Sequence, residues 1–140
     1  MILLDNILKK YNFPKRTLQA KTSFHQIEQE IGFSLPSGYK YYLDNYMGYE
    51  EFIGPELVNL WDIDDLLLFN RSYGIFDNLP LTLGIGNNPS SEFIAIEFID
   101  SHYRIVLSPL IDLDKQYHIV IGNSFTDFFI RLENGKKWFY

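Results

Sequence analysis

The hydrophobic residues in the first third of the chain recur every three or four positions, which is the spacing of one face of a helix. This pattern predicts three helices: over residues 2–11, between Ser23 and Gly32, and from Pro36 to Gly48. Thr22 or Ser23 fits the helix start, Ser23 has capping-box spacing with the glutamine three residues later, and glycine fits a left-handed helix end. Pro36 suits the first turn of a helix, where its missing N–H is not needed.

The pattern changes after residue 55 to short runs rich in β-branched and aromatic residues, which are typical of strands. Turn residues such as Asn87-Asn88-Pro89 and Asp100-Ser101 separate these runs. The sequence therefore predicts five strands: ELVNLW at 56–61, LTLGI at 81–85, EFIAIEF at 92–98, YRIVL at 103–107 and YHIVI at 117–121.

Two more helices are expected beside these strands. Asp62 is a good N-cap, and Asp64 and Asp65 then fall in the first turn, where carboxylates complement the positive end of the helix dipole. Ser124, or the asparagine before it, caps a last helix that stops at an Asn-Gly pair. The order predicts an α+β fold with N-terminal helices, then an antiparallel sheet and a closing C-terminal helix. Periodicity predicts a shared core that includes Leu43, Trp61, Leu66, Ile94, Ile96, Val106 and Phe125.

The length of 140 residues is that of one domain, which we divide into an N-terminal helix with its connection (1–21) and the main α+β part (22–140). The chain has no Cys, which excludes disulfides and thiolate metal sites. Asp5 interrupts the first apolar run, so a secretory signal is not expected. No stretch approaches the roughly 20 apolar residues that span a bilayer. We expect a cytoplasmic protein without a membrane partner.

Charge gives the clearest indication of a partner. The net charge is −6, and residues 44–65 contain seven acids and no Lys or Arg. Nucleic-acid binding is disfavoured, because non-specific affinity for nucleic acid comes from cationic contacts to phosphates. A basic protein partner is favoured, because unlike charges speed the encounter of two proteins.

The acidic tract also contains the aromatic residues Tyr46, Tyr49, Phe52 and Trp61, and aromatic anchors are enriched in protein interfaces. The alternative is an ordinary solvated acidic surface. A second candidate surface is the tail GKKWFY (135–140), for which the alternative is that Trp138 and Phe139 pack onto the body. The hypothesis for the partner-binding site is Asp44, Tyr49, Glu50, Glu51, Phe52 and Glu56.

No catalytic residue, cofactor site or metal site is predicted. His25, His102 and His118 share no helical or strand spacing that would bring two of them to one metal ion, and His118 is expected to point outward from its strand. Ser124 lacks the G-x-S-x-G context of a nucleophile and has the Ser-x-x-Asp spacing of a helix cap. Gly84-x-Gly86 is followed by a strand rather than the helix that receives phosphates in a dinucleotide loop.

The segment IEQEIGFSLPSGYKYYLDNYMG (27–48) is similar to the opening signature of the SUKH superfamily, the cell-wall-assembly-regulator-like family that includes many bacterial toxin-immunity proteins. The similarity continues in order through the Trp61 strand, the helix to Asn70, the LGIG turn at 83–86, the EFIAIEF strand and the NSFTDFF helix start. It covers roughly residues 22–133. The chain departs from the family in the NNPSSE loop and at Met47-Gly48-Tyr49, where a paired glycine is common.

The resemblance implies a non-enzymatic bacterial domain that binds and neutralises a cognate toxin, and so acts as an immunity protein. If the toxin is a nuclease, an acidic face would mimic nucleic-acid phosphates in its basic groove. The alternative is a regulatory or scaffolding adaptor for an endogenous partner, as the cell-wall-regulator members suggest. The neighbouring reading frame distinguishes the two, because a secreted toxin encoded beside this gene favours immunity.

Overall fold

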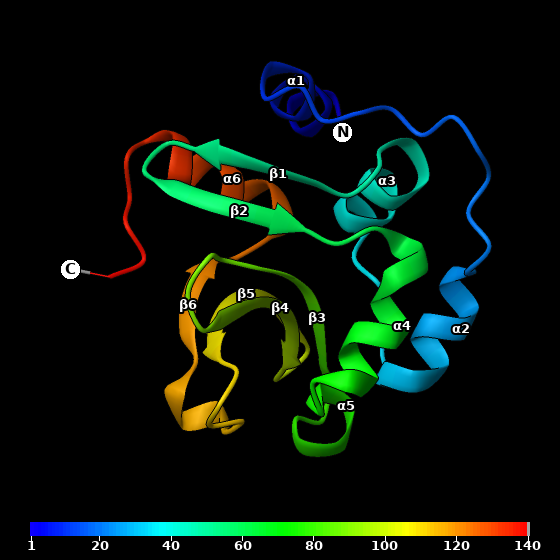
Figure 1. The fold of residues 1–140 in the computed structure, drawn as a ribbon, viewed down its shortest axis with the longest axis vertical. Coiled ribbons are helices and arrows are strands. Elements are labelled where there is room, and N and C mark those ends of the chain that lie inside the picture. Colours follow the sequence, from blue (N-terminus) through cyan, green and yellow to red (C-terminus); the bar gives the residue numbers. More distant parts are fainter. Residues whose placement is uncertain (140) are drawn as a thin grey trace.

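Six antiparallel strands follow one another in chain order across one curled sheet in the computed structural model, which describes residues 1–139 (Figure 1). Each strand pairs with the next, so the sheet is a meander with the order β1-β2-β3-β4-β5-β6. The expected α+β fold is confirmed. The strands are β1 (Tyr49–Ile53), β2 (Glu56–Leu60), β3 (Thr82–Asn87), β4 (Glu92–Ile99), β5 (His102–Pro109) and β6 (Ile119–Gly122).

Six α-helices and one 3-10 turn accompany the sheet in the described residues: α1 (Ile2–Lys10), α2 (Phe24–Ile31), α3 (Ser37–Asn45), α4 (Ile63–Ser72), α5 (Ile75–Asn78), η1 (Lys115–Tyr117) and α6 (Phe125–Glu133). The capping box of Ser23 and the left-handed Gly32, with a φ of 79°, are as expected. Within residues 1–139, no helix has the length and apolar character that a membrane crossing requires.

The predicted end of the third helix at Gly48 is wrong. The helix ends at Asn45, because Tyr46 takes an extended backbone conformation. Gly48 serves a different purpose: a Cβ there would lie 2.6 Å from the backbone nitrogen of Asp62 and 2.8 Å from the carbonyl oxygen of Leu60. Only glycine allows so close a backbone approach.

Strand β1 was not predicted from the sequence. This strand forms a hairpin with β2, and every residue of Tyr49–Ile53 pairs with one of Glu56–Leu60. The hairpin turns at Gly54, which has a φ of +59°. A Cβ on Gly54 would lie 2.0 Å from the carbonyl oxygen of Leu132, so the turn rests directly on the end of α6.

The core lies where α3 and α6 pack against the sheet, and it is rich in aromatic rings. The ring of Phe125 lies 5.2 Å from that of Tyr39 and 5.1 Å from that of Phe129, both edge to face, an arrangement that adds to the gain from burial. Helix α1 adds Leu4 and Leu8 to the same core. All seven residues predicted for the core are buried: Leu43, Trp61, Leu66, Ile94, Ile96, Val106 and Phe125.

Helix α4 is fixed to β3 by a buried asparagine. The side-chain amide of Asn70 donates to the carbonyl oxygen of Gly84 at 2.9 Å, and the Gly84 N–H donates to its side-chain oxygen at 2.7 Å. A Cβ on Gly84 would lie 2.8 Å from Ile75 Cδ1 and 3.2 Å from the Trp61 ring, so a larger residue would displace these side chains. The LGIG segment therefore allows α4 and α5 to pack closely on the sheet.

A buried carboxylate fixes the connection between β5 and β6. Glu97 is fully buried, and its two oxygens lie 2.6 Å from Arg104 Nε and 2.6 Å from His118 Nδ1. Burial tends to raise the pKa of Glu97, but the hydrogen bonds from His118 and Arg104 outweigh it and hold that pKa below its ordinary value.

The prediction that His118 points outward is wrong, because its side chain is only 1% exposed. The sequence analysis placed this residue within a strand, yet η1 ends at Tyr117 and β6 begins at Ile119. His118 therefore precedes the strand, so the alternation of inward and outward side chains along β6 does not apply to it. Its ring points inward to Glu97.

The substitution Glu97→Gln should lower the free energy of unfolding at neutral pH by about 2 kcal/mol, because it replaces the charge-assisted hydrogen bonds of a buried carboxylate with Arg104 and His118 by weaker ones. A carboxyl group with a depressed pKa stabilises the fold above its unfolded pKa of about 4.3, and this contribution is lost as the pH falls through the lower folded pKa. The wild type should therefore lose more stability on acidification than the variant. Urea unfolding at a series of pH values measures both effects.

The matched control for this prediction is Glu50→Gln, which removes an exposed carboxylate on β1. It should leave both the stability at neutral pH and its acid dependence close to the wild type, since surface substitutions shift stability by about 0.5 kcal/mol or less. Equal acid dependence in Glu97→Gln and the wild type would contradict the role assigned to Glu97.

Candidate functional site

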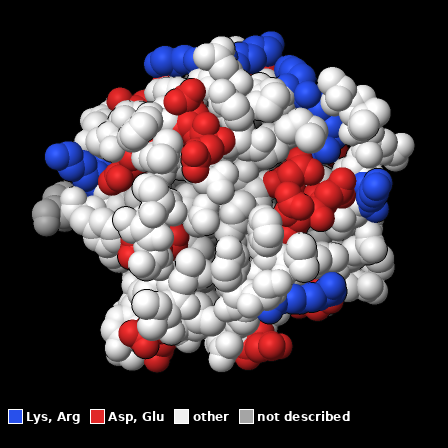
Figure 2. All heavy atoms as spheres, in the orientation of Figure 1, with Lys and Arg blue, Asp and Glu red and all other residues white. Residues whose placement is uncertain are grey.

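A hollow of about 530 Å³ lies between the β1–β2 hairpin and the start of α4. It has acidic and aromatic walls and no Lys or Arg among its lining residues. Figure 2 shows acidic side chains gathered on one face of the molecule, over the hairpin and over the start of α4. The lining residues are Gly48, Tyr49, Glu50, Asn59, Leu60, Trp61, Asp62, Asp65 and Phe69.

Packed rings hold the aromatic wall in place. Trp61 is 5% exposed, and its ring lies 5.0 Å from Phe69 at 67° and 5.9 Å from Tyr73 at 26°. On the other side of the hollow, Tyr49 packs at 5.5 Å against Phe13, which is buried. Because these side chains are held by the core, a partner would meet a preformed surface and lose little rotamer freedom in it.

Asp62 is engaged within the fold. One oxygen accepts from Arg16 Nη2 at 2.6 Å and from the Gly48 N–H at 3.2 Å, and the other accepts from the Asp64 N–H at the start of α4. The Arg16 side chain is only 8% exposed. The expected N-cap is confirmed, and the fold adds a cation that the sequence of residues 44–65 lacks.

Three further acids of the tract are held by backbone N–H groups. Asp64 accepts from Lys21 and Thr22 at 3.0 and 2.9 Å. Burial tends to raise the pKa of Asp64, but the hydrogen bonds from residues 21 and 22 outweigh it and lower that pKa. Glu56 accepts from the Trp138 N–H at 2.9 Å, and Glu51 accepts from the N–H of the next residue at 2.8 Å.

The remaining acids of the tract, Asp44, Glu50 and Asp65, are exposed, and no other side chain or backbone group among residues 1–139 hydrogen-bonds to their carboxylates. Partial burial and the neighbouring Asp62 and Asp64 raise the pKa of Asp65. An incoming cation would relieve this repulsion between like charges. The acidity of the hollow that remains available to a partner comes from Glu50 and Asp65.

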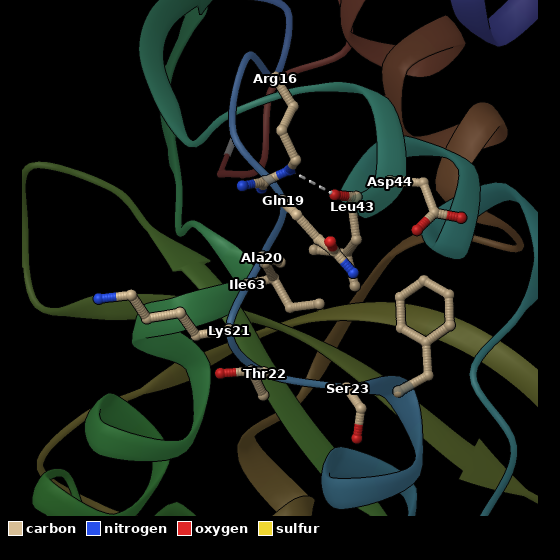
Figure 3. A pocket seen from close by; sticks show the side chains of 10 residues that line it. Arg16, Gln19, Ala20, Lys21, Thr22, Ser23, Leu43, Asp44 and Ile63 are labelled. Carbon is tan, nitrogen blue, oxygen red and sulfur yellow. Dashed lines mark hydrogen bonds between the residues drawn. The ribbon is translucent and has the colours of Figure 1, made fainter.

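The structure brings together only part of the predicted site. Tyr49 and Glu50 line the hollow, whereas Glu51, Phe52 and Glu56 lie on the hairpin outside it. Phe52 is 59% exposed. Asp44 lies beside a second hollow of about 420 Å³, which Arg16 and Lys21 also line (Figure 3).

Most residues of the hollow were not in the predicted site, and Asp65 and Phe69 on α4 are among them. The sequence indicated Asp65 as one acid of the tract and as a residue of the first turn of α4, and it indicated no role for Phe69. They are four residues apart on one helix, and this spacing places two side chains on the same face. That spacing could have indicated an acidic and aromatic helix face.

Of the two aromatic residues of the C-terminal tail that the structure describes, one packs onto the body, and Tyr140 lies outside the described residues. Trp138 is 5% exposed and stacks on Phe128 at 6.5 Å and 15°. Phe139 is 50% exposed, so it does not pack as the alternative for this tail required. Lys136 and Lys137 are exposed.

The other candidate chemistry has a structural explanation. Ser124 Oγ accepts from the Asp127 N–H at 3.0 Å, so the helix-cap interpretation is confirmed. Across residues 1–139, no three His, Cys, Asp or Glu side chains gather in a way that could hold a metal ion.

Comparison with protein-family models and with curated proteins gives no match to this chain.

The substitution Asp62→Ala should lower the free energy of unfolding by about 3 kcal/mol. It removes the cap of α4, which contributes about 1 kcal/mol, and leaves Arg16 as a largely buried cation without its carboxylate. Asp65→Ala removes a carboxylate of the same helix turn and should change stability by about 0.5 kcal/mol or less. Thermal and urea unfolding of both variants measure the difference. If the two variants lose similar amounts of unfolding free energy, the Arg16–Asp62 ion pair does not contribute the stability assigned to it.

Proposed function

We propose that this protein is an immunity protein, which binds a cognate protein toxin and neutralises it without catalysis. One observation carries the proposal: Glu50 and Asp65 face a preformed aromatic hollow and have no intramolecular partner among residues 1–139. Carboxylates that the fold leaves unpaired beside aromatic rings are suited to bind Lys or Arg side chains of another protein.

The hollow offers a basic side chain two favourable interactions. A guanidinium or ammonium group gains charge-assisted hydrogen bonds from the carboxylates of Glu50 and Asp65. The same group gains a cation–π contact when it lies within about 6 Å of a partly buried ring of the hollow such as Tyr49. The net charge of −6 adds long-range attraction for a basic protein.

A nuclease toxin fits this chemistry best, because its active groove is built to bind phosphates. An acidic hollow that enters or covers such a groove would compete with nucleic acid for the same cations. Under this proposal the protein acts in the cytoplasm of the bacterium that makes the toxin, where it meets a folded toxin before export.

The double substitution Glu50→Lys with Asp65→Lys should lower the association rate with the toxin at least tenfold at low salt, and the difference should shrink as salt rises. The reason is that exposed charges act by steering, which salt screens within about 8 Å at physiological ionic strength. The probe is the C-terminal domain of the toxin encoded beside the gene, inactivated by substitution. Stopped-flow or surface-based kinetics across a salt series measure the rate.

The matched control is Asp77→Lys with Asp112→Lys, which makes the same change in net charge at two exposed acids of α5 and the β5–β6 connection. Melting curves show whether both double variants stay folded. Equal slowing by the two pairs would mean that only net charge matters, and the hollow would then not be the binding site. The absence of a toxin reading frame beside the gene would favour the adaptor alternative.

A further inference from the structure

The outer edge of β6 has no strand partner among residues 1–139, because β6 is the last strand of the sheet. Its sequence, IVIG, contains no charge and no proline. Ile119 and Val120 are 40% and 38% exposed. Proteins usually protect a sheet edge with charged residues, proline or a covering segment, because an open edge pairs with other chains. The opposite edge has such protection, since β1 carries Glu50 and Glu51.

We propose that the edge of β6 binds an extended segment of a partner protein, in which acidic and apolar residues alternate, as an additional strand of the sheet. In this mode of recognition, main-chain hydrogen bonds supply affinity and the side chains beside the edge supply specificity. The proposal is independent of the proposed immunity function, because the hollow beside β6 and the acidic hollow share no lining residue.

The tail beside β6 provides the specificity. A small hollow of about 60 Å³ lies between the strand and the tail, and Lys136 and Lys137 line it together with Ile119, Val120 and Trp138. The tail is held there, because the Trp138 N–H donates to Glu56 at 2.9 Å and its ring stacks on Phe128. The apolar strand therefore has a fixed basic border.

The positive charge of Lys136 and Lys137 determines which kind of strand the edge of β6 would bind. Arg131 also lines the hollow, but it is paired with Asp127 at 2.9 Å, so the two lysines supply the uncompensated charge. An acidic strand would pair with them. A second copy of β6 would bring its own two lysines to the same interface, and like charges across an interface are unfavourable. The border thus favours an acidic strand over self-association.

The test uses two synthetic peptides as probes, one with alternating Glu and Val and one with alternating Lys and Val. Isotope-labelled protein is titrated with each, and amide exchange and chemical shifts are followed by NMR. The acidic peptide should bind more tightly and should protect the amides of Ile119–Gly122 from exchange. The variant Lys136→Glu with Lys137→Glu, which alters only exposed side chains, should reverse the preference and lower affinity for the acidic peptide about tenfold.

A second variant, Val120→Glu, places a negative charge on the edge itself and should weaken the complex with the acidic peptide, while melting curves confirm that it folds. The proposal is overturned if the acidic peptide fails to bind, or binds no better than the basic one. It is overturned equally if binding leaves the amides of Ile119–Gly122 unprotected. Dimers of the wild type that Val120→Glu abolishes would show that the occupant of the edge is a second copy, which also contradicts the proposal.

Discussion

The ion pair between Arg16 and Asp62 holds together the part of the molecule on which the acidic hollow depends. Arg16 also donates to the carbonyl oxygens of Leu43 and Tyr46, both at 3.0 Å, where α3 ends and its carbonyl groups lack helical partners. Asp62 meanwhile caps α4. One buried cation therefore serves the negative end of one helix and the carboxylate at the positive end of another. The N-terminal connection, α3, β2 and α4 are fixed relative to one another by this contact.

This arrangement changes the meaning of the acidic tract. Along the sequence, residues 44–65 form a run of acids without a cation. In the fold, Arg16 compensates one of them, and backbone N–H groups bind three others. A carboxylate that must accept structural hydrogen bonds is not free to bind a partner without a loss of stability. The charge that remains available to a partner is therefore smaller and more localised than the sequence indicates, and at the hollow it belongs to Glu50 and Asp65.

The features that could be predicted from sequence are those that neighbouring residues determine. Ser23, Asp62 and Ser124 were found as helix caps, because a cap depends on residues two or three positions away. The features that were missed depend on residues distant in sequence: β1 is defined by its pairing with β2, and Glu97 draws His118 inward from 21 residues away. The site was half predicted for the same reason, since local charge identified Glu50 but only the fold shows that Asp65 shares its hollow.

The two ends of the sheet differ in the physics by which a partner would bind. The net charge of −6 attracts a basic protein from beyond contact range, so binding at the hollow gains from steering. An acidic segment approaching β6 is repelled at long range, and Lys136 and Lys137 attract it only within about the 8 Å over which charges act at physiological salt. Its association should therefore be slow, and its affinity must come from backbone pairing and apolar contact at the edge. The same net charge would thus raise the association rate of a basic partner at the hollow and lower that of an acidic segment at β6.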